Sequence, residues 1–402
     1  MAKLRIRGDV AVVSSGSSFL VKSFTENSDK SLTFTYDCSR AEKKPQENTG
    51  ANESEDKGSD NILAFAFSAS GTYFALTDDS KRLILFHVKP SWECISVRFV
   101  VRRCTALVFT HSEDQVIVAD KSGDVYSFSL LEPNKAGELL LGHLSMLLDV
   151  TLSPDDKYIV TSDRDEKIRI TFFNAPHIIQ SFCLGHTEFV NRIIVLSNYP
   201  TLLLSSSGDG TLRLWEYESG KEASCFNLGS YNEPESAGNK KHLALSAVAY
   251  CENGNYVAAL CDCLPLVHLL QLDAECRTLV CKQKIFLEHR GWDIAFDKLS
   301  RLWILQEDKD TPVMLYRIMD GTWQNANKES RVNEMVDLVR DNWDMFQESV
   351  GTENCCSNLY KVTFDNMSTY LQKKEERTSQ KQSKRKGHQP HDSKGAKMNK
   401  LE

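Results

Sequence analysis

The 402-residue sequence predicts an all-β fold, a seven-bladed β-propeller. Three observations support this prediction: a repeat of about 43 residues, short segments of β-forming residues that recur at the same step, and turn-forming residues between those segments. An internal period of roughly 40 to 45 residues is typical of the four-stranded blades of propellers.

The repeat is clearest between residues 60 and 220. Leu141-Gly142-His143 recurs 43 positions later as Leu184-Gly185-His186. Strand-like segments begin at the same step, at Leu63–Phe67, Ala106–Phe109, Asp149–Leu152 and Arg192–Val195. Turn positions recur in parallel, at Asp79, Ser122, Asp165 and Asp209. Short segments rich in apolar, β-branched and aromatic residues are typical of strands, so we expect four blades here.

Three further blades complete the predicted ring. Val248–Tyr250 with Tyr256–Leu260 indicates a fifth blade, and Trp292–Phe296 with Leu302–Leu305 indicates a sixth. Residues 9–38 alternate apolar and small residues around turn signals, as a divergent first blade would. Seven blades closed in a ring leave only short, protected sheet edges.

The remaining segments define the predicted domain layout. The propeller spans 1–325, with a disordered insertion at 40–60 and a loop at 229–243, both poor in apolar residues. Residues 326–372 form a helical extension packed on the propeller, because apolar residues there have mixed three- and four-residue spacing. These residues are Val332, Met335, Val336, Leu338, Val339, Trp343 and Phe346. Residues 373–402 are predicted to be a basic, largely disordered tail.

Composition narrows the possible functions. The formal net charge of −7 argues against a protein that coats nucleic acid with its whole surface. The twelve cysteines have no zinc-ligand spacing and the N-terminus lacks an apolar signal segment, so we expect unpaired thiols in a reducing compartment. Because no apolar run approaches the roughly 20 residues that cross a bilayer, we expect a soluble protein without a membrane partner.

One repeat contains the polar network that is typical of WD-repeat blades. His186, Asp209 and Trp215 have the expected spacing, with Ser205 or Ser207 as the hydroxyl between them. Buried polar groups in such a network must be hydrogen-bonded, and they then stabilise the blade. An acid–base pair of His186 and Asp209 is the alternative, but no nucleophile accompanies them. We interpret these residues as structural.

The preceding repeat has a partial copy of this network. His143 pairs with Asp165 in our prediction, and Thr171 takes the position of the Trp, so we expect His143 to be structural in a blade that is stabilised differently. Gly208-Asp209-Gly210 lacks the continuation of a phosphate loop and is predicted to be a hairpin turn. Since no catalytic, dinucleotide or metal-protease motif occurs, we expect no enzyme activity, cofactor, metal or small-molecule substrate.

Charged residues are concentrated in one hairpin, at Arg164, Asp165, Glu166, Lys167 and Arg169. Arg213 occupies the position of Arg169 in the next repeat, so a solvated strand residue is the simpler interpretation. However, an Arg held beside carboxylates is preorganised for bidentate pairing with an acidic group of a partner. Arg169 is therefore a candidate interface residue.

The last thirty residues are rich in Lys and Arg, including Lys373, Lys374, Arg377 and Lys381. Solvated disorder, a nuclear-import signal at 381–386 and a phosphate-binding arm are three compatible interpretations. Basic residues on a flexible arm would add salt-sensitive, sequence-independent affinity for RNA.

Several blocks have a more specific pattern than a generic repeat. They are LGHLSMLLDV (141–150), SPDD (153–156), DRDEKIR (163–169) and LGHTEFV (184–190), supported by FALTDDSKR (74–82), ADKSGDVY (119–126) and LQKKEER (371–377). With these blocks, most of the chain resembles the WD-repeat non-catalytic subunit of the eukaryotic tRNA (guanine-N7-)-methyltransferase.

This resemblance implies a heterodimer with a separate S-adenosylmethionine-dependent subunit that methylates N7 of a guanosine in the tRNA variable loop. The present chain would stabilise that enzyme without catalysing the reaction. The residue that matches Arg169 contacts the catalytic subunit in the family, and Asp165, Glu166 and Lys121 lie near it. The basic C-terminal segment is expected to assist tRNA binding, and a nuclear location is expected. The alternative is a general WD-repeat adaptor of chromatin or ubiquitin-ligase complexes.

Overall fold

The computed structural model describes residues 1–24, 32–44, 58–231, 244–262, 264–352, 356–361, 367, 371, 373 and 374. Residues Met1–Tyr360 form one compact unit, and Lys361–Glu402 form a second. Most of the predicted insertion at 40–60 and most of the loop at 229–243 lie outside the described residues.

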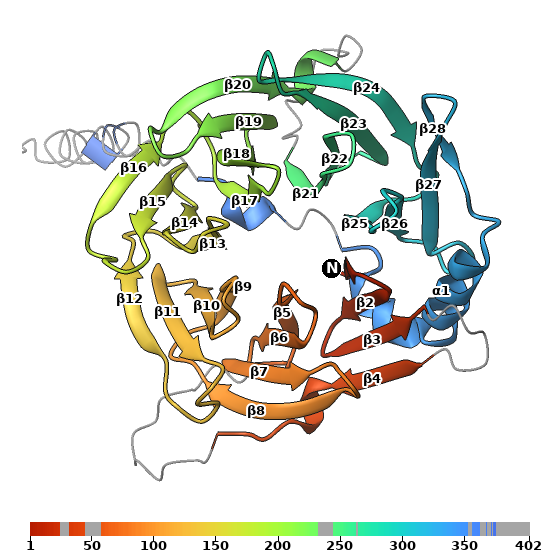
Figure 1. The fold of residues 1–402 in the computed structure, drawn as a ribbon, viewed down its shortest axis with the longest axis horizontal. Helices are drawn as coiled ribbons and strands as arrows, with labels where there is room; N and C mark the ends of the chain where they lie inside the picture. The colour runs from red at the N-terminus through yellow and green to blue at the C-terminus, as the bar shows by residue number, and fades with distance from the viewer. Residues whose placement is uncertain are drawn as a thin grey trace, which may run out of the picture. The chain divides into compact units, whose positions relative to one another are not determined.

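The first unit is a seven-bladed β-propeller (Figure 1), which confirms the predicted fold class. Each blade is an antiparallel sheet of four consecutive strands. The first two blades are β1 (Lys3–Arg7), β2 (Val10–Ser15), β3 (Ser18–Ser23) and β4 (Thr33–Asp37), then β5 (Ile62–Phe67), β6 (Tyr73–Asp78), β7 (Arg82–His87) and β8 (Glu93–Phe99). The third and fourth are β9 (Cys104–Phe109), β10 (Gln115–Asp120), β11 (Asp124–Ser129) and β12 (Glu138–Gly142), then β13 (Leu147–Leu152), β14 (Tyr158–Asp163), β15 (Ile168–Phe172) and β16 (Ile179–Cys183). The fifth and sixth are β17 (Val190–Leu196), β18 (Tyr199–Ser207), β19 (Thr211–Glu216) and β20 (Lys221–Asn227), then β21 (Leu245–Cys251), β22 (Tyr256–Cys261), β23 (Leu266–Asp273) and β24 (Thr278–Phe286). The seventh is β25 (Gly291–Phe296), β26 (Leu302–Gln306), β27 (Val313–Met319) and β28 (Thr322–Asn325).

Burial follows from this stacking of blades. The second strands β6, β10 and β14 are buried along nearly their whole length, because neighbouring blades cover both faces of each sheet. The middle of each strand is therefore mainly apolar, whereas each strand ends in a buried aspartate, Asp78, Asp120 or Asp163. The outermost strands β12 and β16 are largely exposed instead.

The first blade begins earlier than predicted. Its innermost strand is β1, whereas the prediction placed this blade within residues 9–38. The strand was missed because three of its five residues, Lys3, Arg5 and Arg7, are charged. Their side chains line cavities at the centre of the ring, while Leu4 between them is fully buried.

Two aspartates join neighbouring blades at the centre of the ring. Asp149 on β13 accepts a hydrogen bond from the backbone N–H of Ile193 at 2.9 Å. Asp293 on β25 accepts one from the backbone N–H of Leu4, also at 2.9 Å. The first contact joins consecutive blades, and the second joins the last blade to the first. The ring therefore closes through the same type of contact that joins its consecutive blades.

A C-terminal helix covers this junction. The helix α1 (Ser330–Asp341) contacts β3 of the first blade and β27 of the last, and Figure 1 shows it beside both. Its buried face consists of Val332, Met335 and Val339, at helical spacing. The 3-10 helix Trp343–Ser349 follows and packs into the same cluster. We call the junction of the first and last blades with residues 330–349 the closing seam. The other 3-10 helices within the described residues span Cys38–Arg40, Leu228–Tyr231 and Ser357–Leu359.

His268 on β23 is an unusual member of the core. It is fully buried, and neither ring nitrogen has a hydrogen-bond partner among the described residues. Burial, with a smaller contribution from the charge of Lys284, lowers the pKa of His268 to about 4. The folded chain therefore holds this imidazole in its neutral form.

We predict that acid destabilises the propeller through His268. The unfolded histidine has a pKa of about 6.5, so the unfolded chain binds a proton first as the pH falls. Stability should decrease between about pH 6.5 and 4, by roughly 3 kcal/mol at most. His268→Leu should abolish this decrease in urea unfolding measured from pH 7 to 4. His177→Leu, at an exposed position, should keep the wild-type profile, and an unchanged profile for His268→Leu would contradict the prediction.

Candidate functional site

His186, Asp209 and Trp215 lie in one buried polar network. His186 Nδ1 is 2.9 Å from Asp209 Oδ2, and His186 Nε2 is 2.7 Å from Ser205 Oγ. The indole N–H of Trp215 donates to the same hydroxyl at 2.8 Å. Of Ser205 and Ser207, it is therefore Ser205 that joins the His to the Trp. The network ties the loop before β17 to β18 and β19.

The electrostatics of this network do not suit acid–base catalysis. Asp209 also accepts hydrogen bonds from Thr211 Oγ1 at 2.7 Å and from the N–H of Thr187 at 3.1 Å. Burial alone would raise the pKa of Asp209, but the hydrogen bond and charge of His186, with the contacts from Thr211 and Thr187, outweigh it and hold the pKa below its usual range. A carboxylate stabilised in this way is a weak proton acceptor.

His143 is paired with Asp163, so the predicted pairing with Asp165 was wrong. His143 Nδ1 lies 3.2 Å from Asp163 Oδ2, and its Nε2 lies 2.8 Å from Thr161 Oγ1. Thr171, at the position of the Trp, is buried and its hydroxyl has no hydrogen-bond partner among the described residues.

The register of the strands explains this error. Asp163 ends β14 opposite Leu147, and in the next blade Ser207 ends β18 opposite Val190. An aspartate at the strand end therefore reaches the histidine directly in one blade, whereas the turn residue Asp209 must supply the carboxylate in the other. Counting the repeat step aligned the two turns but could not distinguish these positions.

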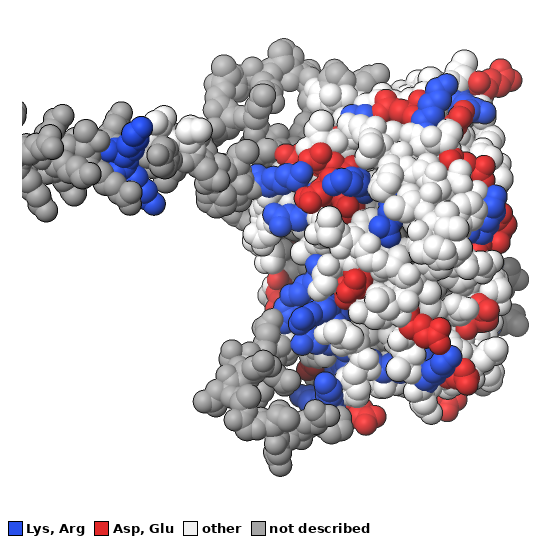
Figure 2. Space-filling view, turned by 90° about the vertical axis from the view of Figure 1, so that its left-hand side faces the viewer, with Lys and Arg blue, Asp and Glu red and all other residues white. Residues whose placement is uncertain are grey.

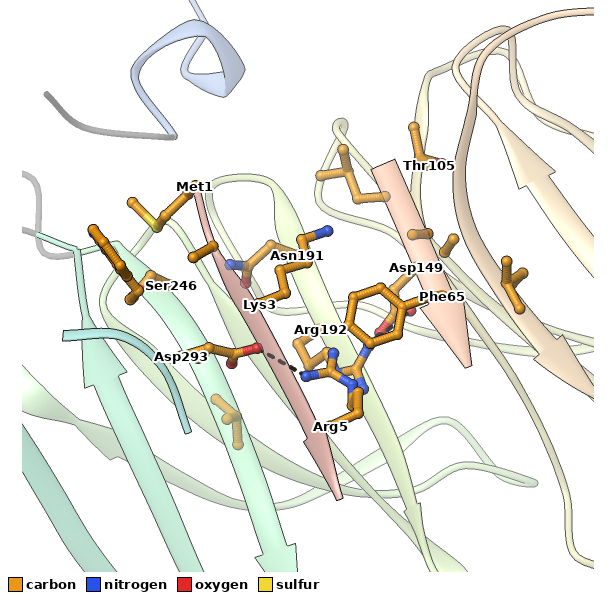
Figure 3. A pocket seen from close by; sticks show the side chains of 18 residues that line it. Met1, Lys3, Arg5, Phe65, Thr105, Asp149, Asn191, Arg192, Ser246 and Asp293 are labelled. Atoms are coloured by element: carbon orange, nitrogen blue, oxygen red, sulfur yellow. Dashed lines mark hydrogen bonds and ion pairs between the residues drawn. The ribbon is translucent and has the colours of Figure 1, made fainter. Parts of the chain in front are cut away.

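A cavity of about 220 Å³ lies at the centre of the ring, lined by the innermost strands of all seven blades. Figure 3 shows its polar side chains: Arg5 pairs with Asp293 at 2.9 Å, and Arg192 lies 3.4 Å from Asp149. Both aspartates also hold backbone N–H groups between blades, so these ion pairs belong to the blade junctions. Among the described residues, no group of His, Cys, Asp and Glu could hold a metal ion, and no helix is long and apolar enough to cross a membrane.

The charged hairpin joins β14 to β15. Glu166 has a φ of +73°, in the left-handed region that tight turns use. Arg169 lies on β15, and its Nη1 donates to the carbonyl of Gly142, the last residue of β12 in the preceding blade, at 3.0 Å. The Nε of Arg169 has no hydrogen-bond partner within the described part of the chain. Arg169 therefore spans two blades with part of its donor capacity unused.

The partial burial of Arg169 favours pairing with a further hydrogen-bond acceptor. Burial lowers the pKa of Arg169, and the negative charge of Asp163 counteracts this effect. Asp165 and Glu166 are half-buried in the turn of the same hairpin. A partly desolvated guanidinium gains from a bidentate ion pair because water no longer satisfies all its donors.

Lys121 is exposed in the turn between β10 and β11 of the preceding blade. This turn contacts the loop after β12, since the N–H of His143 donates to the carbonyl of Gly123 at 2.7 Å. The turn of Lys121 therefore lies beside the loop that follows Gly142, the residue whose carbonyl accepts the hydrogen bond from Arg169.

Exposed apolar side chains lie on the strand that pairs with that of Arg169 and in the loops after β12 and β16. Leu144, Phe182 and Leu184 are 109%, 40% and 63% exposed, and Phe182 is the strand partner of Arg169. We call Lys121, Arg169 and these three residues the docking face. Figure 2 shows the side of the ring with β12, β15 and β16, where charged side chains lie beside an uncharged area. Sequence reasoning missed these apolar residues because nothing in the sequence distinguishes them from the apolar residues of the core.

Of the predicted RNA-binding residues, Lys373 and Lys374 are exposed. Arg377 and Lys381 lie outside the described residues, as does the basic segment 381–386.

Comparison with known proteins agrees with the predicted resemblance. Residues 22–138 and 132–313 match the family model of the tRNA methyltransferase TRM82 WD40 domain. The tRNA (guanine-N(7)-)-methyltransferase non-catalytic subunit WDR4 of Mus musculus is 54% identical over 376 residues, covering 93% of this chain and 91% of the relative. The Homo sapiens protein of the same name is 53% identical over 370 residues, covering 92% of this chain and 89% of the relative. The tRNA (guanine-N(7)-)-methyltransferase non-catalytic subunit wuho of Drosophila mojavensis is 32% identical over 330 residues, covering 80% of this chain and 82% of the relative.

Solved structures share the fold at low identity. The structure of U3-55K has a TM-score of 0.60 at 19% identity and covers 76% of this chain and 87% of its own. The crystal structure of RRP9 WD40 repeats has a TM-score of 0.60 at 18% identity and covers 76% of this chain and 86% of its own. Because the sequence relatives match nearly the whole chain at high identity, the chain belongs to the family of WD-repeat non-catalytic subunits of tRNA (guanine-N7-)-methyltransferase.

Proposed function

We propose that this chain is the scaffold subunit of a tRNA (guanine-N7-)-methyltransferase. It binds and stabilises a separate S-adenosylmethionine-dependent subunit in a heterodimer, and that subunit forms N7-methylguanosine in the variable loop of tRNA. The names of the relatives, which call them non-catalytic subunits, support a catalytic partner. The observation that carries the proposal for this chain is the docking face, with Arg169 only partly hydrogen-bonded among exposed apolar side chains.

The chemistry of the docking face specifies its partner surface. Apolar residues around a partly buried charge exclude water, and the ion pair inside such a rim is then strong. The matching surface carries a carboxylate for Arg169 and apolar side chains for Leu144, Phe182 and Leu184. Binding contributes an ion pair that the isolated propeller lacks at this position, so the scaffold prefers the assembled state.

Arg169→Leu should weaken binding to the methyltransferase subunit while the propeller still folds. Truncating one partner of a buried interfacial charge pair costs about 2–5 kcal/mol, which is roughly 30-fold or more in affinity. Titration calorimetry with the purified catalytic subunit measures this loss.

Arg213→Leu is the matched control for this experiment. Arg213 has the same position in the next blade, but its side chain pairs with Glu222 and Thr211 of its own blade. This variant should bind the catalytic subunit normally. Equal affinities for Arg169→Leu and the wild-type chain would reject the docking face as the interface.

We further propose that the basic tail assists tRNA binding and directs the chain to the nucleus. Lys and Arg residues displace counterions from phosphates, so their number sets the salt dependence of binding. The tail supplies such residues from Lys373 onward, including the run Lys384-Arg385-Lys386.

Deleting residues 373–402 should weaken tRNA binding by the heterodimer without separating its subunits. The slope of log K against log salt should decrease by roughly 0.7–0.9 for each phosphate that the tail neutralises in the full-length chain. Filter binding at several salt concentrations measures the slope, with gel filtration as the control for assembly. An unchanged slope would exclude the tail from RNA binding, and an unchanged distribution of the truncated chain in cells would exclude it as the import signal.

A further inference from the structure

We propose that Arg164 is a positioning residue, which fixes the end of the propeller chain at Leu359 and Tyr360 and thereby sets the point from which the basic tail extends. This inference rests on the proposed function of the tail. Arg164 belongs to the charged hairpin, and its sequence position groups it with the residues that face a partner. Its side chain instead contacts its own chain.

Two hydrogen bonds define this anchor. Arg164 Nε donates to the carbonyl of Leu359 at 2.9 Å, and Nη2 donates to the carbonyl of Tyr360 at 3.3 Å. The backbone N–H of Arg164 donates to the carbonyl of Met146 at 2.9 Å, which holds the turn itself in place. A guanidinium fork suits this task because it presents parallel donors in a rigid plane. The last carbonyls of a helical turn have no hydrogen-bond partner within that turn.

The anchored segment also packs against the neighbouring blade. The hydroxyl of Tyr360 donates to the carbonyl of Gly208 at 3.0 Å, in the turn between β18 and β19. Its ring meets Phe189 edge-on at 5.0 Å between centroids. Cys356, at 4% exposure, lies in one cluster with Phe189 and Ala244. Gly208 is required here, since a Cβ at this position would overlap the ring of Phe189.

This anchor determines how the tail is tethered. Lys373 follows Tyr360 by thirteen residues, so it lies within at most about 45 Å of Tyr360 even if that stretch is fully extended. The hairpin that holds Tyr360 also carries Arg169. The tether of the tail therefore begins at the hairpin of Arg169, and a short tether limits how far its basic residues lie from that point.

Without Arg164, the tether would begin elsewhere on the ring. The preceding fixed point is Cys356, which packs with Phe189 before β17 and with Ala244 before β21. Releasing Tyr360 thus adds four residues to the tether and moves its origin from the hairpin of the fourth blade to the junction of the fifth and sixth blades.

The test compares Arg164→Ala with Lys167→Ala in the full-length heterodimer. Lys167 is exposed in the same hairpin, and its side chain donates to the carbonyl of Asp165 within the turn, so the control removes the same charge without the anchor. Arg164→Ala should increase hydrogen exchange in residues 356–361 and raise the KM for tRNA about three- to tenfold, with kcat and heterodimer affinity unchanged. Tyr360→Phe should give a smaller increase in both exchange and KM. In chains lacking 373–402, Arg164→Ala should no longer change the KM.

The outcomes are distinguishable. Unchanged exchange in Arg164→Ala would overturn the anchor, and increased exchange with an unchanged KM would overturn its positioning role. An equal KM effect in the truncated chain would also overturn it, because the tail would not be what Arg164 positions. If the wild-type heterodimer fails to methylate tRNA, the proposed function fails, whereas the exchange measurement still tests the anchor by itself.

Discussion

Replacing Phe346 with alanine is expected to lower the free energy of unfolding by about 3–5 kcal/mol, as for other buried aromatic residues. Phe346 is fully buried in the closing seam. Its ring stacks on Trp292 of the last blade, with centroids 5.9 Å apart, and on Trp343 at 5.7 Å. Leu4 of the first blade belongs to the same cluster. The substitution therefore leaves a cavity where the two ends of the ring meet.

Urea unfolding of the purified propeller measures this loss, and hydrogen exchange locates it. Exchange should increase most in β1 and β25, because these strands meet at the closing seam. Gln347→Ala, at the next and exposed position, should leave stability and exchange nearly unchanged. A loss below about 1 kcal/mol for Phe346→Ala would mean that the C-terminal segment does not hold the ring closed.

Arg82→Leu should also lower the free energy of unfolding by about 3–5 kcal/mol, because it leaves a buried carboxylate without its cation. Arg82 is 1% exposed, and its Nε donates to Asp78, which is fully buried, at 2.8 Å. Its Nη2 pairs with Asp60 at 2.7 Å and donates to the carbonyl of Cys38 at 2.9 Å. Burial raises the pKa of Asp78 even with Arg82 beside it. The arginine thus joins the end of the first blade to the second.

The pH dependence of this loss identifies its cause. In the variant, the pKa of Asp78 in the folded state lies above its value in the unfolded state. The charged carboxylate therefore destabilises the folded variant at neutral pH, and this destabilisation is lost as the pH falls through the folded pKa. Urea unfolding should therefore show a smaller loss under acidic conditions, and Arg82→Leu combined with Asp78→Leu should recover part of it at pH 7. Arg102→Leu, at an exposed arginine, is the control. If the loss of stability in Arg82→Leu were independent of pH and equally large in the double variant, its cause would be lost packing and not the unpaired charge.

The blades could be predicted because each is a local unit. Strand pattern, turn chemistry and repeat step all lie within about 43 consecutive residues, so a single copy contains the information that defines it. The exception was β1, whose charged residues hid the strand pattern because they face the polar centre of the ring. The pairing of His143 also failed, since the repeat step does not show whether a strand end or a turn supplies the carboxylate.

The candidate site could be predicted only in part. Arg169 was identifiable from the concentration of charge in its hairpin, but its hydrogen bond to Gly142 crosses 27 residues to another blade. Leu144 and Leu184 are ordinary apolar residues in sequence, and only the structure shows that they are exposed.

The number and order of the blades, the family, and the charged hairpin and basic tail could all be predicted from the amino-acid sequence. The closure of the ring and the position at which its chain ends could be seen only in the folded structure. Asp293 meets Leu4 across 289 residues, and Arg164 meets Leu359 across 195. Periodicity describes neighbours along the chain and within one blade, whereas these contacts join residues that only the closed ring brings together. The physical role of Arg164, which the sequence grouped with a partner interface, therefore follows from the closed ring and from no local pattern.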